Sequence, residues 1–436
     1  MNPNRPRLGA MSSTALLTDH YELTMLAGAL RDERGMIPCV FEVFGRRLPD
    51  GRRYGVVAGT ERVLEAIADF RFGEPELEYL RAHEVVDERA LDWLAGYRFT
   101  GDVDGYPEGE LYYPGSPILT VHAPFVVGVV LETVILSILN HDSAIASAAA
   151  RMASAAGERP MIEMGSRRTH EQSAVAAARS AYLAGFASTS NLEAGRRHGI
   201  PTKGTSAHAY TLLHETEEQA FASQVAALGP GTTLLVDTYD ITEGINTAVR
   251  VAGTGLGAVR IDSGDLGVMA HKAREQLDRL GAHDTRIVVS GDLDEYAIAA
   301  LRAEPVDAYG VGTSVVTGSG SPTAGLVYKL VEVNGRAVAK RSSHKASIGG
   351  AKAVLRRHKE TGTALEEVVH PWSRQVPLGA HDTRITTPLL RSGSPVEGLP
   401  ALADSRERLR DALVRVPWEG LKLSRGEPAI PTTFLE

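Results

Sequence analysis

Cysteine is nearly absent from this chain of 436 residues, because Cys39 is the single one. One cysteine excludes an intramolecular disulfide and a structural zinc site built on several cysteines. Basic charge is also scarce, since 46 Lys and Arg residues face 54 Asp and Glu residues, for a net charge of −8. This balance gives no electrostatic basis for binding nucleic acid or anionic membranes, and an anionic substrate would need local arginines.

Long uninterrupted apolar runs are lacking as well. The most apolar stretch, PFVVGVVLETVILSIL, contains Glu132 and is shorter than a membrane-spanning helix requires. No apolar run directly follows the basic start of the chain, so an export signal is not expected. We therefore expect a cytoplasmic protein with no membrane partner and with a disordered tail over residues 1–13.

Seven short apolar runs in the middle of the chain indicate the fold. Most are separated by a helical pattern, at a spacing of roughly 20–30 residues, as in consecutive βα units. Buried parallel strands that alternate with helices indicate an α/β barrel, and we expect it to close, with irregularities. The runs are MIEMGSRR, GFASTSN, IPTKGTSAH, TTLLVDTYD, AVRIDSGD, TRIVVSGD and VDAYGVGTS.

The two ends of the chain have a mixed α/β character. The segment CVFEVFGRRLP alternates apolar and polar residues as a strand would, and helical patterns flank it. We predict an N-terminal α/β domain over residues 14–130, a barrel over 131–344, and a C-terminal segment over 345–436 that packs back on the N-terminal domain.

Polar and small residues follow the apolar runs, and in α/β barrels the active site lies at the C-terminal ends of the strands. Arg167 and Arg168 follow the first run, and guanidinium groups fit carboxylates and phosphates in two-point contact. Glycine lets backbone N–H groups approach a phosphate, and aspartate can hold ribose hydroxyls or hydrated Mg²⁺. These ends favour a phosphorylated substrate. The later candidates are Arg260, Asp262, Ser263, Gly264, Gly291, Asp292, Gly312 and Thr313.

His208, in GTSAHAY, is a further candidate at the end of a run. A metal site is disfavoured because His214 is six residues away and no H-x-x-x-H or H-x-E pattern occurs. A packed core histidine is the ordinary alternative. Asp237 ends the next run and could fix the tautomer of the imidazole and raise its basicity. This favours a nucleophile or a general base.

In their order and spacing, the motifs of this chain resemble those of nicotinate phosphoribosyltransferases, from about residue 15 to residue 355. The resemblance implies an irregular, TIM-like α/β barrel of the type II phosphoribosyltransferases plus an N-terminal α/β domain completed by C-terminal segments. It also implies a homodimer with a shared active site. The motifs are LLTDHYELTM, FEVFGRRLP, PEGELYYPGSPIL, LETVILSILN, EMGSRR, GFASTSN, GTSAHAY, VDTYDI, RIDSGD, VSGDLDE, YGVGTSVVT and VYKL.

The resemblance implies that nicotinate and 5-phosphoribosyl-1-pyrophosphate react to nicotinate mononucleotide and pyrophosphate. ATP is the implied co-substrate, which makes the enzyme formally a ligase, and it would phosphorylate His208, oriented by Asp237. Mg²⁺ would neutralise phosphate charge, with ligands that the sequence does not identify. The implied contacts to the phosphoribosyl group are Arg260, Asp262, Gly291, Gly312 and Thr313.

The resemblance also implies a pocket for the pyridine ring. Tyr21 matches a ring-stacking tyrosine donated across the dimer, and Met164 stands where the barrel usually offers an aromatic partner. A thioether can still pack on a ring. Arg46 is a candidate to reach the neighbouring site. The basic segment after VYKL contains Lys340, Lys345 and Lys352, whose role is open between this resemblance and a solvated strand.

Ser190 bears on the choice between nicotinate and nicotinamide. Relatives that use the amide carry an aspartate at this position, which would repel a carboxylate. Arg167 or Arg168 could bind the nicotinate carboxylate while the other contacts pyrophosphate. The alternatives are a nicotinamide or quinolinate phosphoribosyltransferase and, with less support, a catalytically silent paralogue that serves in binding or regulation.

Overall fold

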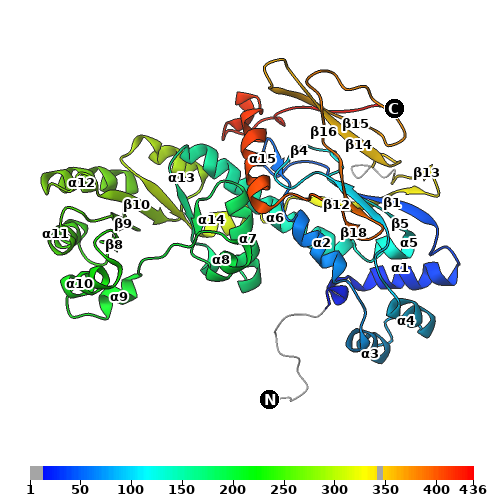
Figure 1. Cartoon of the computed structure of the whole chain (residues 1–436), viewed down its shortest axis with the longest axis horizontal. Helices are drawn as coiled ribbons and strands as arrows, with labels where there is room; N and C mark the ends of the chain where they lie inside the picture. The colour runs from blue at the N-terminus through cyan, green and yellow to red at the C-terminus, as the bar shows by residue number, and fades with distance from the viewer. Residues whose placement is uncertain (1–12, 341–346) are drawn as a thin grey trace. The chain divides into compact units, whose positions relative to one another are not determined.

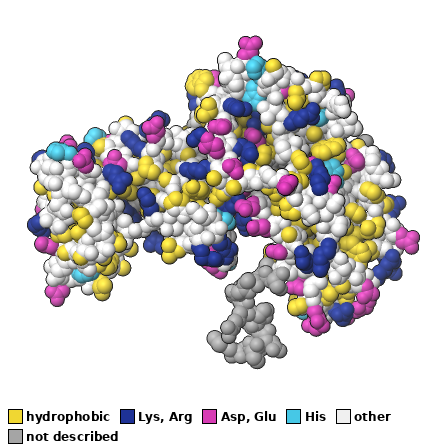
Figure 2. All heavy atoms as spheres, in the orientation of Figure 1, with side chains coloured by type: hydrophobic (Ala, Val, Ile, Leu, Met, Phe, Trp, Pro, Cys, Tyr) yellow, Lys and Arg dark blue, Asp and Glu magenta, His cyan; other side chains and the backbone are white. Residues whose placement is uncertain are grey.

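The computed structural model describes residues 13–340 and 347–436. The predicted tail, residues 1–13, lies almost wholly outside the described residues, and Lys345 lies outside them as well. On the displayed face of the described residues, acidic and basic side chains are interspersed, without a broad area of one sign (Figure 2). This mixture agrees with the near balance of charge in the sequence.

Contacts divide the chain into two compact units, and Figure 1 labels many of their elements. The first unit comprises residues 1–143 and 323–436, and the second comprises residues 144–322.

The first unit is built on antiparallel sheets, in the orders β13-β12-β1-β5-β3-β17-β18, β16-β14-β15-β19 and β2-β4; β15 and β19 alone pair in parallel. The strands are β1 (Pro38–Gly45), β2 (Gly55–Val56), β3 (Asp102–Gly105), β4 (Leu111–Tyr112), β5 (Leu119–Pro124), β12 (Leu326–Val333), β13 (Arg336–Ala337), β14 (Lys352–His358), β15 (Ala364–Pro371), β16 (Thr383–Arg384), β17 (Thr387–Arg391), β18 (Ser394–Pro395) and β19 (Thr432–Phe434). The helices are α1 (His20–Arg31), α2 (Thr60–Ala68), α3 (Glu74–Ala82), α4 (Glu88–Ala95), α5 (Phe125–Val129) and α15 (Leu402–Val414).

The division by contacts differs from the boundaries predicted after residues 130 and 344. Helix α6 (Glu132–Ala156) begins in the first unit and continues into the second. Strand β12 precedes the second predicted boundary, yet it pairs antiparallel with β1 and therefore belongs to the sheet of the first unit.

The segment Phe125–Ala156 is long and apolar enough to cross a membrane, judged by length and composition alone. It continues well beyond the apolar run considered in the sequence. Within its most apolar window, 61% is buried in the protein. Because buried core helices meet the same criterion, this segment is a weak indication of a membrane span.

Strand β1 is buried along nearly its whole length rather than on one face. Its Glu42 is fully buried and pairs with Lys352, whose Nζ lies 2.8 Å from Glu42 Oε2. The same Nζ donates to the carbonyls of Ile348 and Gly350 at 2.9 and 2.7 Å. Burial raises the pKa of Glu42 to about 7, against the lowering effect of Lys352. Lys352 is therefore a structural cation and no part of a solvated strand, whereas Lys340 is exposed.

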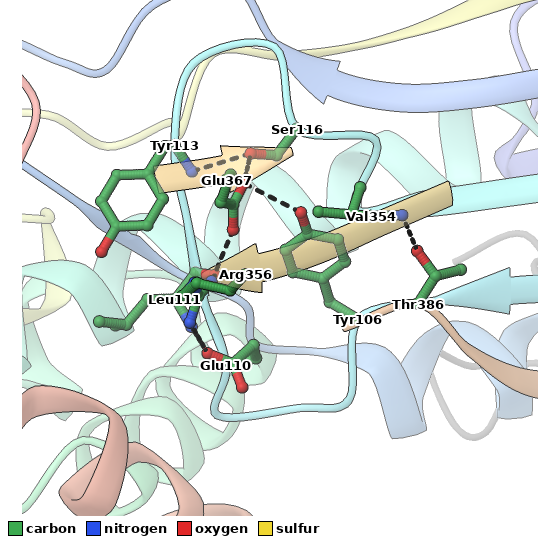
Figure 3. A network of polar contacts seen from close by, with 9 residues as sticks. All are labelled: Tyr106, Glu110, Leu111, Tyr113, Ser116, Val354, Arg356, Glu367 and Thr386. Carbon is green, nitrogen blue, oxygen red and sulfur yellow. Dashed lines mark hydrogen bonds and ion pairs between the residues drawn. The ribbon is translucent and has the colours of Figure 1, made fainter. Parts of the chain in front are cut away.

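A second buried charge network joins β14 and β15 to the loop before β4 (Figure 3). Arg356 lies 2.5 Å from Glu110 Oε1 and 2.6 Å from Glu367 Oε1. The other oxygen of Glu367 accepts hydrogen bonds from the hydroxyls of Tyr106 and Ser116. Both carboxylates thus share one buried guanidinium, which links segments distant in the sequence.

We expect Arg356→Met to lower the free energy of unfolding by about 3–5 kcal/mol, because it leaves Glu110 and Glu367 buried without their cation. Urea unfolding followed by circular dichroism measures this change. The matched control is Arg357→Met, the next residue, whose side chain is 44% exposed and pairs with Glu366. Its loss should stay below about 1 kcal/mol. Equal losses in the two variants would contradict the assignment.

The second unit contains a six-stranded sheet, in the order β7-β6-β11-β10-β9-β8, with all neighbouring pairs parallel. Its strands are largely buried, which is why they occur as continuous apolar runs. The strands are β6 (Met161–Glu163), β7 (Ser188–Thr189), β8 (Thr233–Leu235), β9 (Ala258–Ile261), β10 (Arg286–Gly291) and β11 (Ala308–Val311). The helices are α7 (Glu171–Leu183), α8 (Leu192–His198), α9 (His208–Leu212), α10 (Glu217–Leu228), α11 (Ile241–Ala252), α12 (Leu266–Arg279), α13 (Glu295–Ala300) and α14 (Thr313–Val316).

The sheet of the second unit is curled but, among the described residues, keeps β7 and β8 as open edges. The expected closure is therefore incomplete. The run IPTKGTSAH forms no extended strand, because its single pairing is a bridge between Thr202 and Thr189. The six parallel strands still bring their C-terminal ends to one edge, where the polar residues of the motifs gather.

Candidate active site

A cavity of about 240 Å³ lies at the C-terminal ends of β6, β9, β10 and β11. Three arginines and two aspartates face it, so the lining is cationic although the whole chain is acidic. This local charge suits an anionic ligand. The lining residues are Met164, Arg167, Arg168, Arg260, Asp262, Ser290, Gly291, Asp292, Gly310, Gly312 and Thr313.

A larger cavity of about 600 Å³ shares Met164, Arg167 and Arg260 with the first. It brings Ser190 into the same lining as Met164 and Arg167. It also adds Lys203, a cation that we did not single out in the sequence. The available signal was its position in the run that ends at His208.

Two glycines allow close approach at the strand ends. Gly291 has φ +139°, a conformation that side chains with a Cβ rarely adopt. A Cβ on Gly310 would lie 2.8 Å from Met164 Sδ, so the methionine can pack against β11 because this residue is glycine.

Arg260 is held in place by the ends of two neighbouring strands. Its Nε donates to Ser290 Oγ at 2.8 Å, and its Nη2 lies 3.3 Å from Asp262 Oδ1. The Ser290 hydroxyl also donates to Asp262. The guanidinium is therefore oriented before any ligand binds. Ser290, to which the sequence assigned no role, is part of this arrangement.

His208 is the first residue of α9, and its side chain is 43% exposed. Its Nε2 lies 3.9 Å from Oδ1 of Asp237, and its Nδ1 lies 3.1 Å from Thr238 Oγ1. An exposed imidazole with a buried carboxylate behind it is the arrangement of an oriented nucleophile or base. Thr238 was missed because a threonine beside an aspartate carries no signal of its own.

Asp237 is anchored by the end of the next strand. Its Oδ2 accepts hydrogen bonds from the Asp262 N–H at 2.8 Å and from Ser263 Oγ at 2.7 Å. Its Oδ1 is buried without a hydrogen-bond partner. Burial, followed by repulsion from Asp237 and Asp240, raises the pKa of Glu217 to about 7.

Residues 16–140 match the family described as the nicotinate phosphoribosyltransferase (NAPRTase) N-terminal domain. Over 425 residues the chain is 61% identical to a nicotinate phosphoribosyltransferase of Mycobacterium tuberculosis, which covers 96% of this chain and 94% of that protein. The chain belongs to the nicotinate phosphoribosyltransferase family.

More distant relatives agree with this family membership. A human nicotinate phosphoribosyltransferase is 30% identical over 501 residues, covering 94% of this chain and 92% of that protein. The crystal structure of human nicotinic acid phosphoribosyltransferase superposes with a TM-score of 0.84 at 26% identity, covering 96% of this chain and 98% of that one. The predicted family and fold class are confirmed.

Some residues that the sequence analysis singled out lie outside the two cavities. His208, Asp237 and Ser263 line neither, and Gly264 has φ +83° in the turn before α12. Tyr21 and Arg46 belong to the first unit, with Tyr21 exposed on α1. Their roles in a neighbouring subunit's site stay predictions.

Proposed function

We propose that this protein forms nicotinate mononucleotide and pyrophosphate from nicotinate and 5-phosphoribosyl-1-pyrophosphate, and that it couples this reaction to ATP hydrolysis through a phosphohistidine. The carrying observation is the exposed His208 in front of the buried, half-satisfied carboxylate of Asp237. Family membership supports the transfer reaction, and this pair of residues supports the coupling to ATP.

In the phosphoryl step, an imidazole nitrogen of His208 attacks the γ-phosphorus of ATP. A P–N bond forms, the bond to the β,γ-bridging oxygen breaks, and ADP leaves. Asp237 stabilises the imidazolium that develops, and Thr238 helps to orient the ring. Water later cleaves the P–N bond to release phosphate and return the free histidine.

In the ribosyl step, the pyridine nitrogen of nicotinate bonds to C1 of the ribose while pyrophosphate leaves from it. The reaction centre becomes cation-like, so positioning and electrostatics carry the catalysis. Arg260, held by Ser290 and Asp262, is placed to bind phosphate oxygens. Gly312 and Thr313 begin the short helix after β11 and offer backbone donors to the 5-phosphate.

The larger cavity supports nicotinate as the acceptor. Ser190 contributes no negative charge there, and Arg167 offers a cation beside Met164. Nicotinamide or quinolinate as the acceptor, or a catalytically silent paralogue, has less support, because the relatives compared above are nicotinate phosphoribosyltransferases.

Magnesium fits this site as a phosphate-bound ion. The part of the chain that the structure describes has no group of three or more His, Cys, Asp or Glu residues arranged for a metal. Mg²⁺ commonly uses one or two carboxylates together with substrate phosphates. Asp262 and Asp292, which line the smaller cavity, are the carboxylates that would hold it, and the ion would neutralise phosphate charge.

A homodimer with a shared site, located in the cytoplasm, also belongs to the proposal. Tyr21 supports the shared site, because the residue is 47% exposed and accessible to a partner. Partial burial, followed by the nearby Glu132 and Glu22, raises the pKa of Tyr21 to about 12, so the phenol stays neutral.

The test uses the purified protein with γ-labelled ATP, and then with nicotinate or nicotinamide plus 5-phosphoribosyl-1-pyrophosphate. We expect acid-labile, base-stable protein label, and nicotinate turnover far above nicotinamide turnover. An unlabelled protein that still turns over nicotinate would refute the phosphohistidine step and leave the proposed transfer reaction in place. Equal turnover of the two acceptors would refute the selectivity.

A further inference from the structure

Glu163, the last residue of β6, is a fully buried carboxylate to which neither the family resemblance nor the proposed reaction gives a role. Among the described residues, no cation pairs with its side chain. Burial raises its pKa, against the lowering effect of the hydrogen bonds from Thr189 and Gly165. A buried carboxyl group without a cation is costly unless its oxygens are hydrogen-bonded.

The hydrogen bonds of Glu163 join the ends of two neighbouring strands. Its Oε1 accepts from the N–H of Gly165, in the turn after β6, and its Oε2 accepts from Thr189 Oγ1 at 2.5 Å, in β7. Its backbone carbonyl accepts from the Ser190 N–H at 2.8 Å. One residue thus holds the turn on one side and the end of β7 on the other.

These two strand ends carry the residues that line the larger cavity on this side. Met164 and Arg167 flank the turn that Glu163 holds, and Ser190 follows Thr189 directly. The backbone pairing of β6 with β7 and a hydrogen bond from Asn191 Nδ2 to Ser166 Oγ at 3.0 Å also join the two groups. The side chain of Glu163 adds the contacts at the strand ends themselves, because it bonds to the turn and to β7 at once.

We propose that Glu163 is a positioning residue that fixes the width of the nicotinate pocket by holding the Met164–Arg167 turn against Ser190. It acts through these residues and touches no substrate itself. The inference rests on the proposed placement of nicotinate in this cavity. Its loss should weaken nicotinate binding more than phosphate binding, because Ser190 lines the larger cavity alone, whereas Met164 and Arg167 line both cavities.

The test compares steady-state kinetics and nicotinate affinity by calorimetry for Glu163→Gln, Thr189→Val and the double variant. Glu163→Gln should raise the KM for nicotinate about tenfold, as expected for loss of a hydrogen bond to a charged group. The KM for 5-phosphoribosyl-1-pyrophosphate should rise by no more than about threefold, because Arg260, Gly312 and Thr313 keep their places although Arg167 lines both cavities, and kcat should stay within about twofold. Thr189→Val should act in the same direction, and Thr189→Ser, which keeps the hydroxyl, should restore nearly normal affinity.

Comparison of the double variant with the two single variants provides a second test of the inference. The double variant should lose less than the product of the two single losses, because both variants weaken the contact between Glu163 and Thr189, although Thr189→Val also removes the acceptor of the Asn191 N–H. Glu367→Gln is the matched control: it alters a buried carboxylate of the first unit that also accepts a hydroxyl hydrogen bond. It should lower stability and leave the KM for nicotinate unchanged.

Two outcomes would overturn the inference. Unchanged nicotinate affinity in both Glu163→Gln and Thr189→Val would do so, as would equal increases in both KM values, which indicate general loosening. Should Glu163→Gln fail to fold, the comparison of Thr189→Val with Thr189→Ser still decides. A wild-type protein that does not turn over nicotinate would overturn the proposed function and this inference together. A wild-type protein that turns over nicotinate, with nicotinate affinity unchanged in the variants, would overturn this inference alone.

Discussion

Replacing His208 by alanine is expected to reduce labelling from γ-labelled ATP to background and to abolish the effect of ATP on nicotinate mononucleotide formation. The reason is that the imidazole is the only part of the proposed relay that forms a bond to phosphorus. Transfer without ATP should persist, because the phosphate-binding strand ends do not include His208. Labelling and product formation with and without ATP measure both effects.

His214→Ala is the control for this prediction. His214 lies six residues after His208, and its Nδ1 is 2.8 Å from the carbonyl of Tyr210, so its role is local packing. This variant should retain the full label. Equal labelling of the His208 variant and the wild type would exclude His208 as the phosphate carrier.

Ser190→Asp is expected to raise the KM for nicotinate roughly 100-fold, since a like charge facing a carboxylate costs several kcal/mol and each 1.4 kcal/mol is a factor of ten. Nicotinamide carries no charge and can donate its amide N–H to the new carboxylate. The ratio of kcat/KM for the two acceptors should therefore shift strongly toward nicotinamide. Steady-state assays with each acceptor measure this shift.

The control is Ser190→Asn, which adds similar volume without charge. This variant should change the KM for nicotinate by no more than about fivefold. A neutral amide does not repel the carboxylate, and it occupies no more of the cavity than the aspartate does. If the aspartate and asparagine variants lost nicotinate affinity equally, size would be responsible and charge would not.

Much of the second unit could be predicted from its runs of apolar residues. Six of the seven expected runs form strands, because buried parallel strands are mostly apolar, although β7 is the polar pair Ser188–Thr189. The prediction of a full strand at IPTKGTSAH was wrong. Polar and small residues follow Pro201, and the segment pairs only through a single bridge at Thr202. The gathering of Arg167, Arg260 and Asp262 was also predictable, since parallel strands end at one edge.

Other features could not be predicted because their signal lies in a partner far along the chain. The sequence leaves a solvated strand open as the place of Lys352. In the structure Lys352 is buried against Glu42, 310 residues away. The sequence of β1 predicts that buried and exposed residues alternate. In the structure both faces of β1 are covered, so Glu42 is buried as well. No local pattern marks a charged residue whose counter-charge arrives from another sheet.

The sequence by itself determined the family, the βα order of the second unit and the chemical character of its strand ends. These properties follow from local periodicity and from residue types at fixed positions. The tertiary structure alone decided that Asp237 presents one free oxygen to His208 and that Glu163 joins β6 to β7. Strand register and backbone direction set those distances, and neither is encoded in a single short segment.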